Sequence, residues 1–278
     1  MKIRHYEFSP SAALSPYVDC YWYQSFDSEP VLESPIQRCV PLGMTELIFH
    51  ITRRGEWVVL ENGIWKPLPD AIVVGVYKDA VVWKANSDCK AFGIRLKPEA
   101  MLHLFNIPAA RIVNNYTDIN TFFGKDMSCL TGKIFGQVLI PQLIAAAEEF
   151  LLAQLRNAKQ TFRYLAEGTK LIRQSKGEIS LEDLSTSLCI SERQLQRCFK
   201  DGIGMGPKAY LRIIRFRNAY EYLHQNGCNI SWADVSYHFG YADQAHFIRD
   251  FKQFTGAVPT TMVLHNEQFQ QMTGSFTN

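Results

Sequence analysis

The chain has 278 residues, of which 47% are apolar and 20% are charged, and its formal net charge at pH 7 is +2. This composition excludes disordered and collagen-like chains, and the length favours about two domains. The small net charge neither requires nor excludes a nucleic-acid partner, because local patches of charge decide such binding.

Seven cysteines without a Cys-x-x-Cys spacing predict neither a disulfide framework nor a zinc site. The first residues, MKIRHYEFSP, lack the apolar core of a signal peptide. The most apolar stretch, 138–147, contains Pro141 and Gln142 and is shorter than the ~20 residues that span a bilayer. We therefore expect a cytoplasmic protein with no metal, no cofactor and no membrane partner.

The first half of the chain is rich in short runs of β-branched and aromatic residues, which favour strands. Asn62-Gly63 is a two-residue hairpin signal. The predicted strands are 45–52, 56–61, 71–77, 80–85 and 90–96. These runs predict a β-rich N-terminal domain.

Polar side chains on these strands are candidates for binding a ligand. In the strand at 45–52, Glu46 and His50 share one face, while Leu47 and Phe49 share the other. We propose Glu46, His50 and Arg95 as candidate effector-binding residues; the alternative is that they are surface or satisfied core groups. Aromatic residues nearby are candidates for an apolar pocket or for plain core: Trp22, Trp57, Trp65, Trp83, Tyr21 and Tyr23.

The pattern becomes helical after Leu96, where Pro98 suits the start of a helix. Residues 107–137 give no clear pattern. Good helix formers from about residue 138 predict one helix, and 161–175 predicts another. The polar stretch RNAKQT that separates them is typical of a linker, so we place the domain boundary between residues 157 and 158.

The second half contains an internal repeat. Phe199-Lys200, Gly204 and Pro207 recur as Phe251-Lys252, Gly256 and Pro259, each with the same offset of 52 residues. The shared pattern, F-K-x-x-x-G-x-x-P, predicts a duplicated structural unit.

The first copy, about 181–200, has the pattern of a helix-turn-helix. Leu184 and Leu188 share one face of a first helix, Cys189-Ile190 suits a short turn, and Ser191 is a candidate N-cap for the second helix. Leu195 and Phe199 face inward from that second helix. Its opposite face carries Arg193, Gln196, Arg197 and Lys200, side-chain types that contact base edges and phosphates.

The second copy, about 231–253, has the same organisation. Phe247 and Phe251 point inward. The outward residues are Gln244, Ala245, Ile248, Arg249 and Lys252, with His246 on the flank. An outward Ala or Ile suits contact with a thymine methyl group.

A long helix at about 207–225 is predicted between the two copies. A rigid joint of this kind fixes the spacing of the two helix-turn-helix units. Two recognition helices in successive major grooves stand ~34 Å apart, so a single chain with two units can span the distance that a dimer usually spans.

The stretches LEDLSTSLCISERQLQRCFK, YLRIIRFRNAYEYL and VSYHFGYADQAHFIRDFKQFTGAVP resemble the DNA-binding domain of the AraC/XylS family of bacterial transcription regulators. The resemblance covers about 170–265. It implies an all-α domain at 158–278, with two helix-turn-helix units whose second helices read DNA. Trp232-Ala233 and Ser236 depart from the smaller residues usual in the family.

The resemblance assigns DNA-binding roles to particular residues. The first helix-turn-helix contributes Arg193, Gln194, Gln196 and Arg197, and the second contributes Gln244, Ala245, His246 and Arg249. Lys200 and Lys252 are candidates for phosphate contacts, which add affinity without sequence information. The alternative is a solvated basic face on an ordinary helical bundle, which the ordered duplication argues against.

The first half also carries a resemblance. LSPYVDCYWY, VPLGMTELIFHI and AFGIRLKPEA are similar to the poorly characterised N-terminal domain of one branch of the same family. This implies that residues 1–157 form a barrel-like domain that binds an effector, dimerises, or both. The expected architecture is α+β: a sensor or dimerisation domain followed by an all-α double helix-turn-helix domain.

We expect a sequence-specific, effector-responsive regulator of transcription, of the activator type, whose partner is double-stranded DNA. A small-molecule effector, RNA polymerase and a second copy of the chain are compatible partners. The alternative is a constitutive DNA binder whose N-terminal half is a dimerisation or protein-interaction module. We find no nucleophile–base constellation and therefore do not expect an enzyme.

Overall fold

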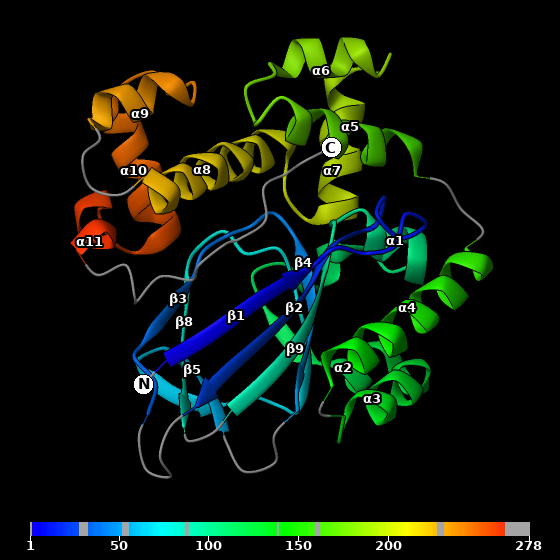
Figure 1. The fold of residues 1–278 in the computed structure, drawn as a ribbon. Helices are drawn as coiled ribbons and strands as arrows, with labels where there is room; N and C mark the ends of the chain where they lie inside the picture. The colour runs from blue at the N-terminus through cyan, green and yellow to red at the C-terminus, as the bar shows by residue number, and fades with distance from the viewer. Residues whose placement is uncertain are drawn as a thin grey trace.

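The computed structural model describes residues 2–27, 33–51, 56–86, 89–137, 139–158, 162–226 and 231–264. Two antiparallel β-sheets and the helices that follow them form the first half of the chain, and the second half is helical (Figure 1). The predicted order, a β-rich domain followed by an all-helical one, is confirmed. Within the described residues, no helix is both long and apolar enough to cross a membrane.

The strands pair in two sheets in which every neighbouring pair is antiparallel. The six-stranded sheet has the order β1 (Lys2–Phe8), β2 (Val18–Asp27), β9 (Cys89–Leu96), β4 (Thr45–His50), β7 (Ala71–Val74) and β10 (Tyr116–Asp118). The four-stranded sheet has the order β3 (Gln37–Cys39), β8 (Val81–Asn86), β5 (Glu56–Glu61) and β6 (Ile64–Pro67).

All five predicted strands are present, with ends that shift by a few residues. The hairpin prediction is confirmed, because Glu61 pairs with Ile64 and the two residues between them have positive φ, 49° at Asn62 and 80° at Gly63. Strands β1, β2, β3, β6 and β10 were not predicted from the sequence.

Helices cover one face of the six-stranded sheet. Leu47 and Phe49 on β4 point into this layer, as their alternation with Glu46 predicts, and both are fully buried. The helical layer consists of α1 (Ala100–Phe105), η1 (Ala109–Ile112), α2 (Ile119–Phe123), η2 (Gly124–Met127), α3 (Ser128–Ile134) and α4 (Ile140–Asn157). The opposite face of the sheet is directed toward the four-stranded sheet.

The second half of the chain is built around one long helix, α8, which lies across one end of the sheets (Figure 1). One helical group packs near its start and another near its end. The elements are α5 (Arg163–Gln174), α6 (Leu181–Ser187), α7 (Glu192–Ile203), α8 (Pro207–Asn226), α9 (Trp232–His238), α10 (Gln244–Thr255) and α11 (Pro259–Leu264).

The repeat seen in the sequence has matching geometry in the two copies. Helices α7 and α10 both end at a glycine in the left-handed conformation, Gly204 with φ of 83° and Gly256 with φ of 70°. Pro207 and Pro259 then begin α8 and α11. Glycine adopts positive φ without strain and proline suits the first helical turn, so the shared pattern is a common stop-and-restart signal.

The two halves share a hydrophobic core. Val40, Leu42 and Met44, which precede strand β4, pack in the same cluster as the buried face of α8. Gly43 lies so close to α8 that an added Cβ would be 3.0 Å from Ile214 Cδ1. We call residues 40–44 the junction segment. Its position means that the β-sheets and the long helix are joined by packing and not only by the chain.

Candidate nucleic-acid interface and ligand pocket

The first candidate reading helix is α7. Its start is fixed by a capping box, in which the Ser191 side chain accepts from the Gln194 backbone N–H and Gln194 Oε1 accepts from the Ser191 N–H at 3.0 Å. Such a cap satisfies backbone donors that the first turn leaves unpaired. Leu195 and Phe199 are buried in the helical core, as predicted.

The opposite face of α7 is open to solvent. All five predicted residues on it are exposed: Arg193, Gln194, Gln196, Arg197 and Lys200. The Gln194 side chain also holds the cap, so its oxygen is already engaged in the free protein.

The second candidate reading helix is α10, whose N-cap is Asp243. The Asp243 carboxylate accepts from the His246 backbone N–H at 2.6 Å, and Phe247 and Phe251 are fully buried. Both units therefore use a short polar side chain as N-cap and aromatic or aliphatic anchors on the inner face.

Four of the five predicted residues on α10 are exposed: Gln244, Ala245, Arg249 and Lys252. His246 is half-buried, with its ring against Tyr241 and its Nε2 atom 3.9 Å from the Asp250 carboxylate. Ile248, which the sequence placed near the outward face, instead packs against the helical core.

Two arginines on α8 bind neighbouring segments of the helical half. Arg212 donates to both carboxylate oxygens of Asp250 on α10, at 2.6 and 3.3 Å. Arg215 donates to the backbone oxygen of Gly177 in the turn before α6, at 2.9 Å. Arg215 is half-buried and bridges α8 to that turn.

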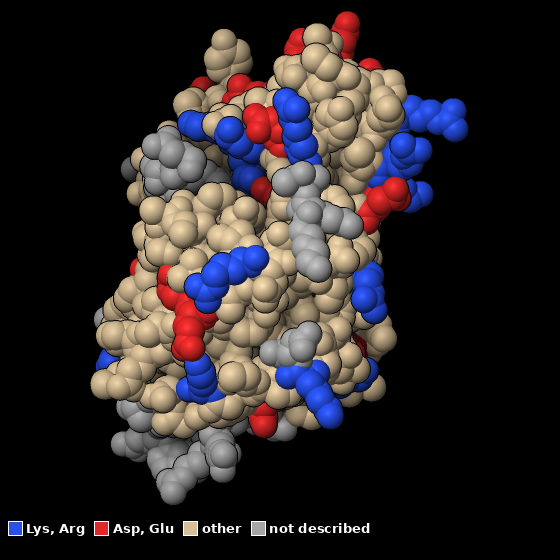
Figure 2. Space-filling view, turned by 90° about the vertical axis from the view of Figure 1, so that its right-hand side faces the viewer, with Lys and Arg blue, Asp and Glu red and all other residues tan. Residues whose placement is uncertain are grey.

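Charged side chains of both signs are visible on one face of the molecule. Figure 2 shows Lys and Arg side chains projecting from one edge of the helical half, while the lower part of that face has scattered residues of both signs. This distribution agrees with the small net charge of the chain.

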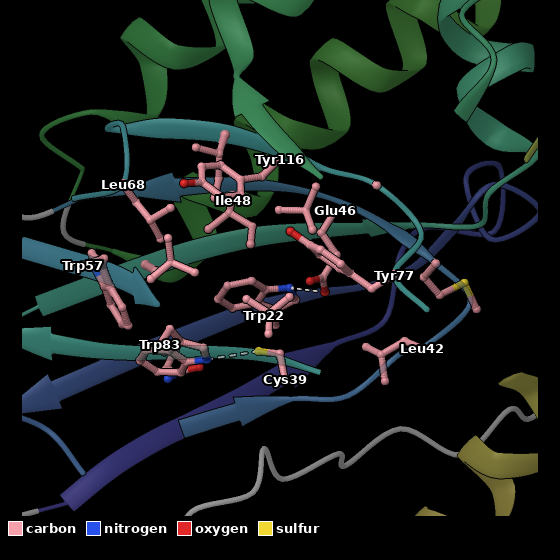
Figure 3. Close-up of a pocket in the computed structure, with 18 of the residues that line it drawn as sticks. Trp22, Cys39, Leu42, Glu46, Ile48, Trp57, Leu68, Tyr77, Trp83 and Tyr116 are labelled. Carbon is pink, nitrogen blue, oxygen red and sulfur yellow. Dashed lines mark hydrogen bonds between the residues drawn. The ribbon is translucent and has the colours of Figure 1, made fainter. Parts of the chain in front are cut away.

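A pocket lies between the two sheets, with a cavity volume of about 110 Å³. Glu46, Ile48 and His50, which share the face of β4 opposite Leu47 and Phe49, all line it. Aromatic side chains from five different strands or loops form much of the wall: Trp22, Trp57, Tyr77, Trp83 and Tyr116. Figure 3 shows Trp22 in the middle of the pocket, Glu46 and Tyr77 beside it, and Trp57 and Trp83 toward the other end.

Trp22 can lie flat in the pocket because its cross-strand neighbour is Gly93. A Cβ atom at Gly93 would overlap the indole ring of Trp22. The indole Nε1 donates to Glu46 Oε1 at 3.0 Å, so the ring and the carboxylate hold each other in place.

The remaining polar groups of the pocket are held by local contacts. His50 Nδ1 lies 2.6 Å from the Pro69 oxygen, and burial lowers the pKa of His50 to about 4 despite that contact. The imidazole is therefore neutral at pH 7 and Nδ1 is the donor. Trp83 Nε1 donates to Cys39 Sγ at 3.0 Å, and burial raises the pKa of that thiol to about 12.

Arg95 lies behind the pocket and does not line it. Its guanidinium, 1% exposed, donates to Glu46 Oε1 and to Glu7 Oε1, both at 2.9 Å. Burial alone would raise the pKa of Glu7, but His5 and Arg95 outweigh it and lower that pKa to about 2. Of the three predicted effector-binding residues, the structure thus brings Glu46 and His50 to the cavity and leaves Arg95 as a support for Glu46.

Several pocket residues were not found from the sequence. Tyr77, Tyr116 and Cys39 reach the cavity from short or irregular segments that have no periodic pattern. Trp65, which was a candidate, lies outside the lining, with its ring 4.7 Å from Lys84 Nζ. Tyr21 points to the opposite side of its sheet, where its hydroxyl donates to Glu148 at 2.9 Å.

Two family models match the chain. A domain of unknown function, DUF6597, matches residues 6–118, and a helix-turn-helix domain matches residues 184–263. The first range covers most of both sheets, and the second covers both repeats and the helix between them.

Two characterised proteins are similar in sequence. The Msm operon regulatory protein of Streptococcus mutans is 24% identical over 184 residues, which are 64% of this chain and 65% of that protein. The lactose operon transcription activator of Staphylococcus xylosus is 36% identical over 73 residues, 26% of this chain and 25% of that protein. The chain thus spans less than two thirds of either relative. Among solved structures, ToxT from Vibrio cholerae has a TM-score of 0.48 at 9% identity, covering 88% of this chain and 98% of that one.

Proposed function

We propose that this chain, a member of the AraC/XylS family, is a sequence-specific DNA-binding regulator of transcription and not an enzyme. The observation that carries the proposal is the pair of capped helices, α7 and α10, whose Arg- and Gln-bearing faces are both exposed. Arg and Gln are the side chains that make bidentate contacts with guanine and adenine in the major groove.

The proposed reading residues are those expected from the sequence. Arg193, Gln196 and Arg197 on α7 read one half-site, and Lys200 contacts phosphate. Gln244, Ala245 and Arg249 on α10 read the other half-site, and Lys252 contacts phosphate. Gln194 and His246, which already serve the cap and the Tyr241 contact, make the remaining contacts on each helix.

In this proposal the N-terminal domain, residues 1–157, is the sensor for a small-molecule effector. Leu42 and Met44 line the pocket and also belong to the core around α8, so a ligand in the pocket touches the same segment that supports the reading helices. Such a ligand shifts the population of DNA-competent arrangements if it binds them more tightly than the others. This shared wall favours an effector-responsive regulator over a constitutive one.

Activation is the proposed outcome, supported by the name of the Staphylococcus xylosus relative. Contact with RNA polymerase and pairing with a second copy are further parts of the proposal. The boundary between residues 157 and 158 lies between α4 and α5, next to residues 159–161, which are outside the described part of the chain.

The test is selection of bound fragments from the host genome by the full chain, followed by footprinting. We expect one asymmetric site with two protected regions about 10 base pairs apart, centre to centre. Absence of any sequence preference at low salt would contradict the proposal. A symmetric site with four protected regions would add that two copies bind together.

A further inference from the structure

The pocket has an unusual balance of charge. Of the described residues that line it, Glu46 is the one carboxylate, and none is Lys or Arg. An anionic ligand would therefore face a negative group with no cation in the wall to compensate it. This argues against carboxylate and phosphate ligands.

Glu46 also has capacity for a further partner. Its Oε1 atom accepts from both Trp22 Nε1 and Arg95 Nε, at 3.0 and 2.9 Å, while its side chain remains 14% exposed. Among the described residues, the hydrogen bonds and ion pairs of Glu46 all go to Oε1 and none goes to Oε2. A carboxylate has about four acceptor positions, so about half of those of Glu46 remain available for a ligand.

The positive charge of Arg95 is shared between Glu46 and two other carboxylates. The same guanidinium faces Glu7 at 2.9 Å and Asp19 at 3.7 Å. Two arginines, Arg95 and, at Asp19 only, Arg217, thus face three carboxylates. Glu46 is the member of this group that borders the cavity. The excess negative charge is directed to where a ligand would sit.

The aromatic side chains that line the pocket also favour a positively charged ligand. The faces of tryptophan and tyrosine rings carry partial negative charge and attract cations within about 6 Å of the ring centre. Trp22 lies flat over Gly93 and donates to Glu46, and Tyr77 lines the same pocket near Glu46 (Figure 3). A carboxylate within a group of aromatic rings is the arrangement that binds ammonium groups.

We infer that the pocket binds a small organic cation, a primary to quaternary amine, with its charge at Glu46 and its carbon atoms against Trp22 and Tyr77. This rests on the proposal that the pocket is the effector site. The cavity volume of about 110 Å³ is smaller than that of an engineered cavity of ~150 Å³ that holds benzene, so the pocket encloses the ammonium group of the ligand and only a few of its carbon atoms.

The experiment compares two probes of the same shape on the full chain. Choline carries a quaternary nitrogen, and 3,3-dimethylbutan-1-ol has carbon in its place and no charge. Binding is measured by quenching of tryptophan fluorescence and by calorimetry. We expect choline to bind at least about 10-fold more tightly, as desolvated cation–aromatic and charge contacts predict. Equal affinity, or binding of neither compound, would overturn the inference.

A pair of variants tests whether Glu46 causes the preference for choline over the neutral compound. Glu46→Gln should remove the preference for choline. Glu7→Gln is the matched control, because Glu7 contacts the same Arg95 but does not line the pocket, and it should leave the preference intact. Loss of the preference in both variants would overturn the assignment to Glu46. If Glu46→Gln does not fold, the comparison of the two probes on the unaltered chain still decides.

A further measurement distinguishes failure of the proposed ligand class from failure of the proposed function. DNA affinity is measured in parallel with and without choline. Choline binding that leaves DNA affinity unchanged supports the ligand class and contradicts the effector role of the pocket. Specific DNA binding without choline binding supports the regulator and contradicts the ligand class.

Discussion

Arg95 and Arg217, which come from different halves of the chain, face the same oxygen of Asp19. Arg95 Nη1 and Arg217 Nη2 each lie 3.7 Å from Asp19 Oδ2, and both arginine side chains are 1% exposed. Arg217 belongs to α8, whereas Asp19 and Arg95 belong to neighbouring strands of the six-stranded sheet. A half-buried carboxylate therefore joins the wall behind the pocket to the helix that lies between the two helix-turn-helix units.

Replacing Asp19 with Asn should lower the free energy of unfolding by about 1–3 kcal/mol. The substitution leaves two buried guanidinium groups with less compensating charge, and uncompensated buried charge is costly. Urea unfolding of the full chain measures the loss. The matched control is Glu33→Gln, which removes an exposed pair with Lys84 and should change stability by less than about 0.5 kcal/mol.

Arg197→Ala and Arg249→Ala should each weaken specific DNA binding by about 1–3 kcal/mol and relax preference at different base positions. The two residues lie on α7 and α10, so the affected positions should fall in separate half-sites. Competition binding with single-base variants of the selected site measures both effects.

Arg156→Ala on the exposed end of α4 is the control for those variants and should leave DNA affinity unchanged. Equal weakening on all sequences by Arg197→Ala and Arg249→Ala would instead identify phosphate contacts. Affinity should also fall steeply with salt, because each neutralised phosphate releases counterions.

Cys189→Gly should stabilise the protein by about 0.5–1 kcal/mol. Cys189 ends α6 with φ of 53°, a left-handed conformation that costs a residue with a side chain, and the equivalent position of the second unit is Gly240 with φ of 63°. Thermal and urea unfolding measure the gain. The reverse test is Gly240→Ala, which should destabilise by a similar amount; a stabilising effect there would contradict the argument.

Stability should depend on the titration of His50 below neutral pH. Its pKa is about 4 in the folded protein against 6.5 in the unfolded chain, so the unfolded chain binds more protons between these values. The stabilisation is complete above pH 6.5 and is lost as the pH falls toward 4, by about 2 kcal/mol between pH 7 and pH 5.

His50→Asn removes this titration while keeping a donor for the Pro69 oxygen. The pH-dependent loss of stability should shrink by about 2 kcal/mol relative to the unaltered chain, whatever the variant costs at pH 7. His224, whose pKa burial also lowers to about 4, and His103, whose pKa burial lowers as well, remain in both proteins and contribute to the residual slope. Identical slopes for the two proteins would show that His50 is not buried in the neutral form.

The helical half was predictable from the sequence because its signals are local. Each signal acts within one helical turn of its own position. The signals are the N-cap Ser191, the glycines that end α7 and α10, Gly204 and Gly256, and the prolines that begin α8 and α11, Pro207 and Pro259. The glycine and proline signals also occur twice, once in each copy of the repeat, which supports their interpretation. The hairpin at Asn62 was predictable for the same reason.

Strand β2 and the charged group around Arg95 were not predictable. Tyr21 packs toward the helical layer and Trp22 toward the pocket, so both faces of β2 are buried and no polar alternation marks it. Arg95 meets Glu7, Asp19 and Glu46, which are distant in the sequence and approach only because β1, β2, β9 and β4 are neighbours in the sheet. Such partners are fixed by strand order, which single-sequence patterns do not encode.

The junction segment also determines how the protein can be divided. Tyr210, Ile213 and Ile214 lie against Gly43, so a fragment that began after α4 would expose this apolar strip of α8 to water. Exposed strips of this kind promote aggregation. Removal of residues 1–157 should therefore yield a fragment that aggregates, and shortened versions of this chain will require polar replacements along that side of the helix.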